Sequence, residues 1–148
     1  MDNSTAISTL NNLIEICHDG ENGFRLAAGA VKDAHAKALF ERFSRQRAEM
    51  ARELESEVRK LGGTPSTGGS VSGAVHRGWI NIKSLVTGGD ESAVIAEAER
   101  GEDAAKEAFT NALKDPLPAG ARELIEQQAA IVKVAHDEVR TLEKTHAH

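Results

Sequence analysis

Residues 97–105 read EAERGEDAA and stand in the middle of a helix that we expect to run from about Asp90 to Lys114. Along this segment, side chains suited to a buried face recur at spacings of three and four, which is typical of a bundle helix. Gly101 lies on that face, and Glu102 lies beside it. Almost all of these side chains are small, so another helix can approach closely: Val94, Ala98, Gly101, Ala105, Ala108 and Ala112.

The same periodicity predicts three more long helices, at about 4–31, 34–61 and 119–144. Ser4 or Thr5 can cap the first of them. Gly20 and Gly23 weaken this helix by about 1 kcal/mol each relative to alanine, but the pattern stays in phase through them and predicts one continuous helix. The predicted inward positions are Ile7, Leu10, Ile14, Cys17, Glu21, Phe24, Ala28 and Val31, then Leu39, Phe43, Gln46, Met50, Leu54, Val58 and Leu61, and finally Ile125, Gln128, Val132, Ala135, Val139 and Leu142.

The connection between the second and third long helices is itself long. Gly62 and Gly63 end the second helix, residues 63–72 have the composition of a flexible linker, and residues 74–89 predict a short amphipathic helix. A connection of this length can return along the bundle, which makes the two long helices parallel, as in ferritin-like folds. We therefore expect one all-α domain over residues 1–148, a ferritin-like four-helix bundle with a long crossover that contains a short helix.

Composition excludes several classes of function. The 148 residues carry a net charge of −5 with no basic stripe, so we expect no nucleic-acid partner. No apolar run approaches the roughly 20 residues that span a bilayer, and the N-terminus lacks the features of a signal peptide, so we expect no membrane association. A single cysteine, Cys17, fits a reducing compartment, and we expect a cytoplasmic protein.

Four polar residues fall at one level of the predicted bundle. Glu21 and Gln46 lie about ten residues below the turn between the first two helices, Glu102 lies about eleven below the start of the third, and His136 about eight below the end of the fourth. These distances agree to within roughly one helical turn. Acids and a histidine facing one another at mid-height are the usual elements of a metal site in a bundle.

The dimetal template needs one Glu on each of two helices and a Glu-x-x-His on each of the other two. The two glutamates and His136 match it, but Lys133 stands where the Glu before the histidine is required, and Gln46 is followed by Glu49 without any histidine. Carboxylates and imidazole favour iron, manganese or zinc. The candidate metal ligands are Glu21, Glu102, His136, Gln46 and Glu49. The alternative is a hydrogen-bonded polar layer that fixes the register of the helices; no catalytic residue is assigned.

Four strings carry a resemblance to a known family: DGENGFR (19–25), GAVHRGWINIKSL (73–85), ERGEDAAK (99–106) and AHDEVR (135–140). Together they resemble an uncharacterised bacterial family of ferritin-like four-helix-bundle proteins, classified as a domain of unknown function. The resemblance covers essentially the whole chain and implies no established activity. Relatives in the wider ferritin-like superfamily bind two iron or manganese ions for oxidase, peroxidase or storage chemistry.

Two functions are therefore compatible with the sequence. The first is a non-catalytic helical bundle that acts through self-association, as a homo-oligomer, or through a partner, with a stress-related role as one option. The second is a metal-binding protein with an oxidase-like, peroxidase-like or storage role at a partly degenerate bundle site. Whether the chain is an enzyme stays open at this point, as does any small-molecule substrate.

Overall fold

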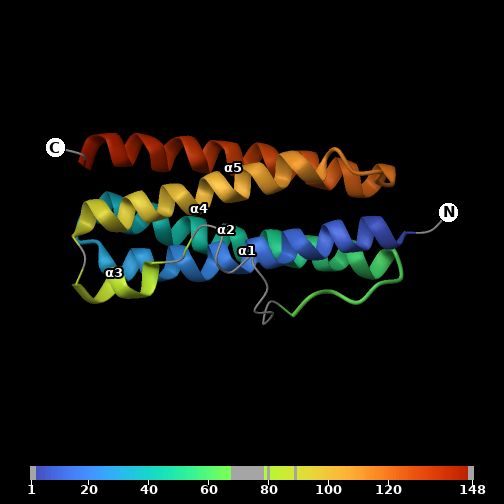
Figure 1. Cartoon of the computed structure of the whole chain (residues 1–148), viewed down its shortest axis with the longest axis horizontal. Coiled ribbons are helices and arrows are strands. Elements are labelled where there is room, and N and C mark those ends of the chain that lie inside the picture. The colour runs from blue at the N-terminus through green and yellow to red at the C-terminus, as the bar shows by residue number, and fades with distance from the viewer. Residues whose placement is uncertain (1–2, 68–78, 80, 89, 147–148) are drawn as a thin grey trace.

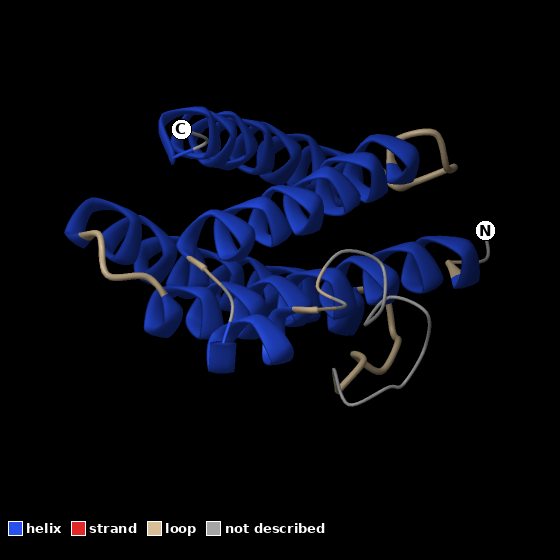
Figure 2. Cartoon of the chain, turned by 60° about the vertical axis from the view of Figure 1, so that its left-hand side comes forward, coloured by secondary structure: helices blue, strands red, loops and turns tan. Residues whose placement is uncertain are grey.

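The computed structural model describes residues 3–67, 79, 81–88 and 90–146. These residues form five helices and no strand (Figures 1 and 2). Four helices are long: α1 (Ser4–Ala30), α2 (Ala34–Lys60), α4 (Glu91–Ala112) and α5 (Ala119–His146). The short helix α3 (Ile82–Gly88) lies against α1 and α4, on the side of the bundle away from α5 (Figure 1). No helix in this part of the chain combines the length and the apolar character that crossing a membrane requires.

Contacts between the helices define their directions. The backbone N–H groups of Lys32 and Asp33, before α2, donate to Glu91 at the start of α4, at 2.9 and 3.3 Å. Farther along both helices, α2 and α4 meet again through their side chains, so they run in the same direction. The hydroxyl of Thr9 donates to Asp115 at 2.6 Å, which places the start of α1 beside the end of α4. Helices α1 and α5 therefore run opposite to α2 and α4, as Figure 1 shows.

The predicted long helices are confirmed to within two residues at each end. Asp33 and Asp90 cap α2 and α4 by accepting from backbone N–H groups three residues later. The predicted cap of α1 is wrong, because Asn3 holds the N-cap position and makes no side-chain capping hydrogen bond. Gly62 ends α2 with a φ of 87°, a conformation that glycine adopts without steric cost.

The short helix begins later than predicted. Helix α3 starts at Ile82, and Trp79 and Asn81 precede it in non-helical conformations. Positions 74–78, 80 and 89 of the predicted helix lie outside the described residues. Trp79 is 9% exposed, and its ring fills a slot between α1 and α4 at Gly23 and Gly101. A Cβ atom built at either glycine would lie 2.3 Å from the ring, so the ring needs glycine on both helices.

The core consists of two apolar clusters, one in each half of the bundle. The half near the α1–α2 turn is aromatic: the Phe24 ring lies 5.7 Å from Phe40, 5.4 Å from Phe43 and 5.0 Å from Trp79. The other half is mainly aliphatic and includes Leu10, Leu13, Ile14, Met50, Leu54, Phe109, Ile125 and Val132. The residues between the two clusters along α2 and α4 are 44–49 and 99–104, which is the predicted level of the polar layer.

Candidate functional site

The level between the two clusters holds a buried ion pair. Arg47 on α2 and Glu102 on α4 are 1% and 0% exposed, and the Arg47 Nη2 donates to the Glu102 Oε2 at 2.5 Å. Burial by itself lowers the pKa of Arg47, but the charge of Glu102 and its hydrogen bond outweigh burial and raise that pKa above its usual value. Each charge therefore supplies the stabilisation that the other would lose on leaving water.

Residues of α1 make room for the guanidinium. Gly20 lies against the Arg47 side chain, since a Cβ atom at Gly20 would be 3.0 Å from Nη1 and 3.3 Å from Cγ. The Arg47 guanidinium also lies 5.4 Å from the centre of the Phe24 ring, within the range of a cation–π contact. Among the described residues, Arg47 Nε and Glu102 Oε1 have no hydrogen-bond partner. The arginine is thus held by an ion pair, a ring and a glycine notch.

Cys17 lies at the edge of this level and is fully buried. Burial raises the pKa of its thiol to about 12, although the charge of nearby Arg47 acts in the opposite direction. A thiol in this state is neutral and a poor nucleophile or metal ligand. The structure therefore gives Cys17 the role of a small core side chain.

The predicted layer has the right height, but two of its members face differently. The side chain of Glu21 is 37% exposed rather than inward, and it lies 3.5 Å from His18 on the surface of α1. Gly20 takes the inward position instead. On α2 the inward residue is Arg47, and Gln46 is half-buried between α2 and α5. The two differences are linked, because the long side chain of Arg47 lies against α1 at Gly20, where no side chain projects.

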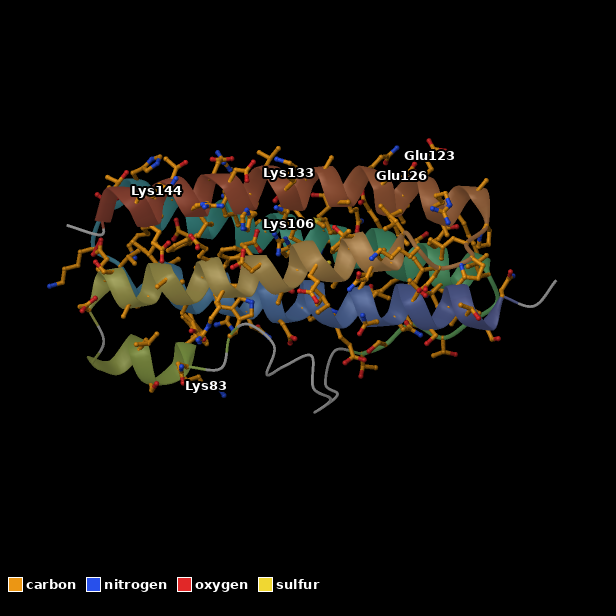
Figure 3. The ribbon with its side chains drawn as sticks, turned by 45° about the horizontal axis from the view of Figure 1, so that its top comes forward. Lys83, Lys106, Glu123, Glu126, Lys133 and Lys144 are labelled. Carbon is orange, nitrogen blue, oxygen red and sulfur yellow. The ribbon has the colours of Figure 1, made fainter. Side chains whose placement is uncertain are left out.

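The other predicted ligands are also dispersed. His136 is buried, and its ring nitrogens lie 2.6 Å from Asp103 and 3.2 Å from Asp137. Lys133 lies on the outer side of α5 and pairs with Asp137 at 3.0 Å (Figure 3). A hydrogen bond with Lys133, and to a smaller extent one with His136, holds the pKa of Asp137 below its usual range. Glu49 is exposed on α2.

A dimetal group does not fit the residues at this level. Across the described ranges, no three His, Cys, Asp or Glu side chains are grouped so that they could hold a metal ion. Of the predicted ligands, only Glu102 faces the centre of the bundle, and the Arg47 guanidinium already neutralises it. A cation bound at Glu102 would lie beside the Arg47 guanidinium and be repelled by its charge. The metal-binding role of the five predicted ligands stays a prediction.

A second polar cluster joins α4 and α5. The pKa of Glu99 is raised to about 7, mainly by burial and to a smaller extent by a hydrogen bond with Glu143. Asp103 adds a further negative charge, and Arg140 partly offsets it. The short contact between Asp103 and His136 belongs to the same face of the α4–α5 pair. The raised pKa of Glu99 favours its neutral form, which can share a hydrogen bond with Glu143 across the contact between α4 and α5.

A groove runs between α2 and α5, where the two helices pack loosely. One hollow of about 490 Å³ lies near the start of α2, and a second of about 410 Å³ lies near its middle. Val134 and Glu138 line both hollows. The apolar lining comes from Leu39, Phe43, Ala130, Ile131, Val134, Ala135 and Leu142.

Sequence reasoning missed Arg47, and a signal for it existed. Arg47 follows Phe43 by four residues and precedes Met50 by three, which is as good a core spacing as that of Gln46. A buried arginine is rare without a partner, so Gln46 was the simpler inward residue. The presence of Glu102 and Gly20 at the same level would have indicated the arginine.

Comparison with known proteins identifies the family. Residues 5–115 match the family described as "Domain of unknown function (DUF2383)". The match covers more than half of the chain, and the chain belongs to that family. No curated protein matches. The matched residues contain α1 except for its first residue, together with α2, α3 and α4 and the Arg47–Glu102 pair, and they end before α5.

Proposed function

We propose that this member of the DUF2383 family is a non-catalytic bundle of the ferritin-like type, which acts through self-association. The Arg47–Glu102 pair carries the proposal. It fills the interior level at which the ferritin-like dimetal template places its ions. The groove between α2 and α5, in contrast, leaves apolar surface for a contact outside the bundle.

The direction of the helices supports the ferritin-like part of the proposal. Two antiparallel pairs, with α2 and α4 parallel, are the arrangement that one long crossover produces. The buried pair then has a structural role, because a charged contact between α2 and α4 fixes their relative height. We infer that the protein keeps the bundle architecture while its interior serves packing.

Sedimentation velocity over a concentration range from low micromolar to several hundred micromolar tests self-association. The expected result is a weight-average mass that rises with concentration from that of one chain, 15.8 kDa, towards that of two. A strict monomer across the whole range would remove the proposal.

Metal binding is the second candidate. One observation favours it: Glu102 is a fully buried carboxylate, and its Oε1 has no hydrogen-bond partner among the described residues. Metal analysis of protein produced with iron, manganese and zinc supplied tests this reading. Retention of one equivalent after desalting, lost in Glu102→Gln but not in the exposed-site control Glu126→Gln, would establish a metal protein. Retention below a tenth of an equivalent leaves the structural role.

A further inference from the structure

A further hollow lies between the first half of α1 and the second half of α4, which run side by side (Figure 1). It has a volume of about 590 Å³, and its lining comes from residues 8–12 and 104–115. We call it the α1–α4 hollow. Its size falls within the range of about 300–1,000 Å³ that is typical of small-molecule sites. It shares no lining residue with the groove between α2 and α5.

One wall of the α1–α4 hollow is a row of hydrogen-bond acceptors. Glu107, Asn111 and Asp115 follow one another at spacings of four residues, and backbone hydrogen bonds continue the helical turn as far as Asp115, so the three lie on one face. The two acids are about 12 Å apart along the axis, at 1.5 Å per residue, with the Asn111 amide halfway between them. One metal ion cannot bridge them, since metal–oxygen distances are about 2.0–2.6 Å.

No basic side chain neutralises the two acids. The described residues that line the hollow include no Lys, Arg or His, and in this part of the chain neither Glu107 nor Asp115 forms an ion pair. Asp115 accepts from the Thr9 hydroxyl at 2.6 Å, and Arg122 donates to the backbone carbonyl of Asp115 rather than to its carboxylate. The hollow therefore attracts cations, and the net charge of −5 adds to that attraction.

The rest of the lining is small or polar. Ala104, Ala108 and Ala112 form a second row at spacings of four residues, next to the row of acceptors. On the α1 side, Ser8 and Asn12 lie one turn apart and offer a hydroxyl and an amide oxygen as further acceptors. A thin chain of methylene groups can lie over the alanines while its charged ends contact the acceptors.

We propose that the α1–α4 hollow binds a linear aliphatic polyamine, with its two terminal ammonium groups at Glu107 and Asp115. With bond lengths of about 1.5 Å, the terminal nitrogens of extended spermidine lie about 11 Å apart, which matches the separation of the two acids. The secondary ammonium group between them lies within reach of the Asn111 amide oxygen. The proposal concerns α1 and α4 alone and does not depend on self-association.

Three probes of different length and charge test the two-ended contact. 1,8-Diaminooctane has as many bonds between its terminal nitrogens as spermidine, whereas 1,4-diaminobutane carries the same charge as 1,8-diaminooctane on a shorter chain. Each is titrated into ¹⁵N-labelled protein at about 0.1 M salt, where charges more than about 10 Å apart are largely screened. We expect 1,8-diaminooctane to bind about three- to fivefold more tightly than 1,4-diaminobutane, because only the longer chain reaches both acids. Spermidine binds at least as tightly, and the amide shifts gather at Thr9, Asn12, Ala108 and Asn111.

Matched charge substitutions separate this site from a general attraction of cations. Glu107→Gln and Asp115→Asn each remove one end of the contact, and Asp115→Asn keeps an oxygen that can accept from Thr9. Each should raise the dissociation constant of 1,8-diaminooctane by about three- to fivefold and abolish its advantage over 1,4-diaminobutane. Glu123→Gln removes the same charge from an exposed position of α5 outside the hollow and should leave the constant unchanged. Circular dichroism checks that all three variants keep the wild-type helix content.

The outcomes decide the proposal. A length preference that disappears in both hollow variants and persists in Glu123→Gln establishes the site. Equal affinity of the wild type for the two diamines, an equal loss in Glu123→Gln, or amide shifts spread over the whole surface would show only general attraction to an acidic protein, and the proposal would be wrong. It would also be wrong if spermidine caused no saturable shifts up to about 10 mM.

Discussion

Replacing Arg47 by methionine removes one charge from the centre of the bundle and leaves Glu102 buried at 0% exposure without its partner. The charge centres of such a pair lie about 4 Å apart, and their attraction is about 4 kcal/mol at the effective dielectric constant of a protein. Breaking a buried pair by removing one member typically costs about 3–5 kcal/mol. We expect Arg47→Met to lose stability in that range at pH 7.

The double variant Arg47→Met/Glu102→Leu gives the contrast. It removes both charges and fills the space with apolar atoms, which for buried pairs is often neutral or stabilising. The double variant should therefore be more stable than Arg47→Met alone, although it carries one more substitution. A variant that lost only packing would not regain stability in this way.

Urea denaturation followed by circular dichroism measures these differences in unfolding free energy. A loss below about 1 kcal/mol in Arg47→Met, or a double variant destabilised by the sum of both single changes, would refute the reasoning.

Three further predictions concern single positions. Gly101→Ala places a methyl group against the ring of Trp79, which should lower the free energy of unfolding by about 1–3 kcal/mol. It should also shift the fluorescence of this single tryptophan to longer wavelength. The control is Gly29→Ala, where no atom lies within 4 Å of the added methyl group, and this variant should stabilise the helix slightly. Because the folded-state pKa of Glu99 is raised to about 7, the folded protein holds a proton that the unfolded chain releases, so stability falls as the pH rises from 4.5 to 7. After allowance for solvent screening this amounts to about 1 kcal/mol, and Glu99→Gln should flatten the profile measured by thermal unfolding. The Cys17 thiol should not react with a thiol reagent in the native protein and should react fully in denaturant, since burial raises its pKa to about 12; rapid native labelling would contradict its buried placement.

Much of the fold follows from local patterns. Periodic apolar positions, together with Gly62 after α2, predict the long helices, because each signal depends on a few neighbouring residues. Residue counting along these helices also predicts the level at which Glu102 meets α2. The inward position of Gln128 is confirmed: it is fully buried, and its amide donates to the Met50 carbonyl at 3.2 Å.

The rotation of each helix about its own axis could not be predicted in the same way. Positions 46 and 47 are both compatible with the core spacing, as are positions 20 and 21. The choice of Arg47 depends on a carboxylate 55 positions later in the chain and on a glycine notch in α1. A metal site was therefore expected from residues that the fold directs to different faces.

The sequence by itself determined the helices, their lengths and the level of the polar layer, because hydrophobic periodicity and capping are properties of neighbouring residues. Only the tertiary structure decided that a guanidinium faces Glu102, that the Trp79 ring lies between two glycines, and that Val134 stands exposed beside a groove. These features depend on the space left between helices, which is set by side chains distant in sequence that pack against one another.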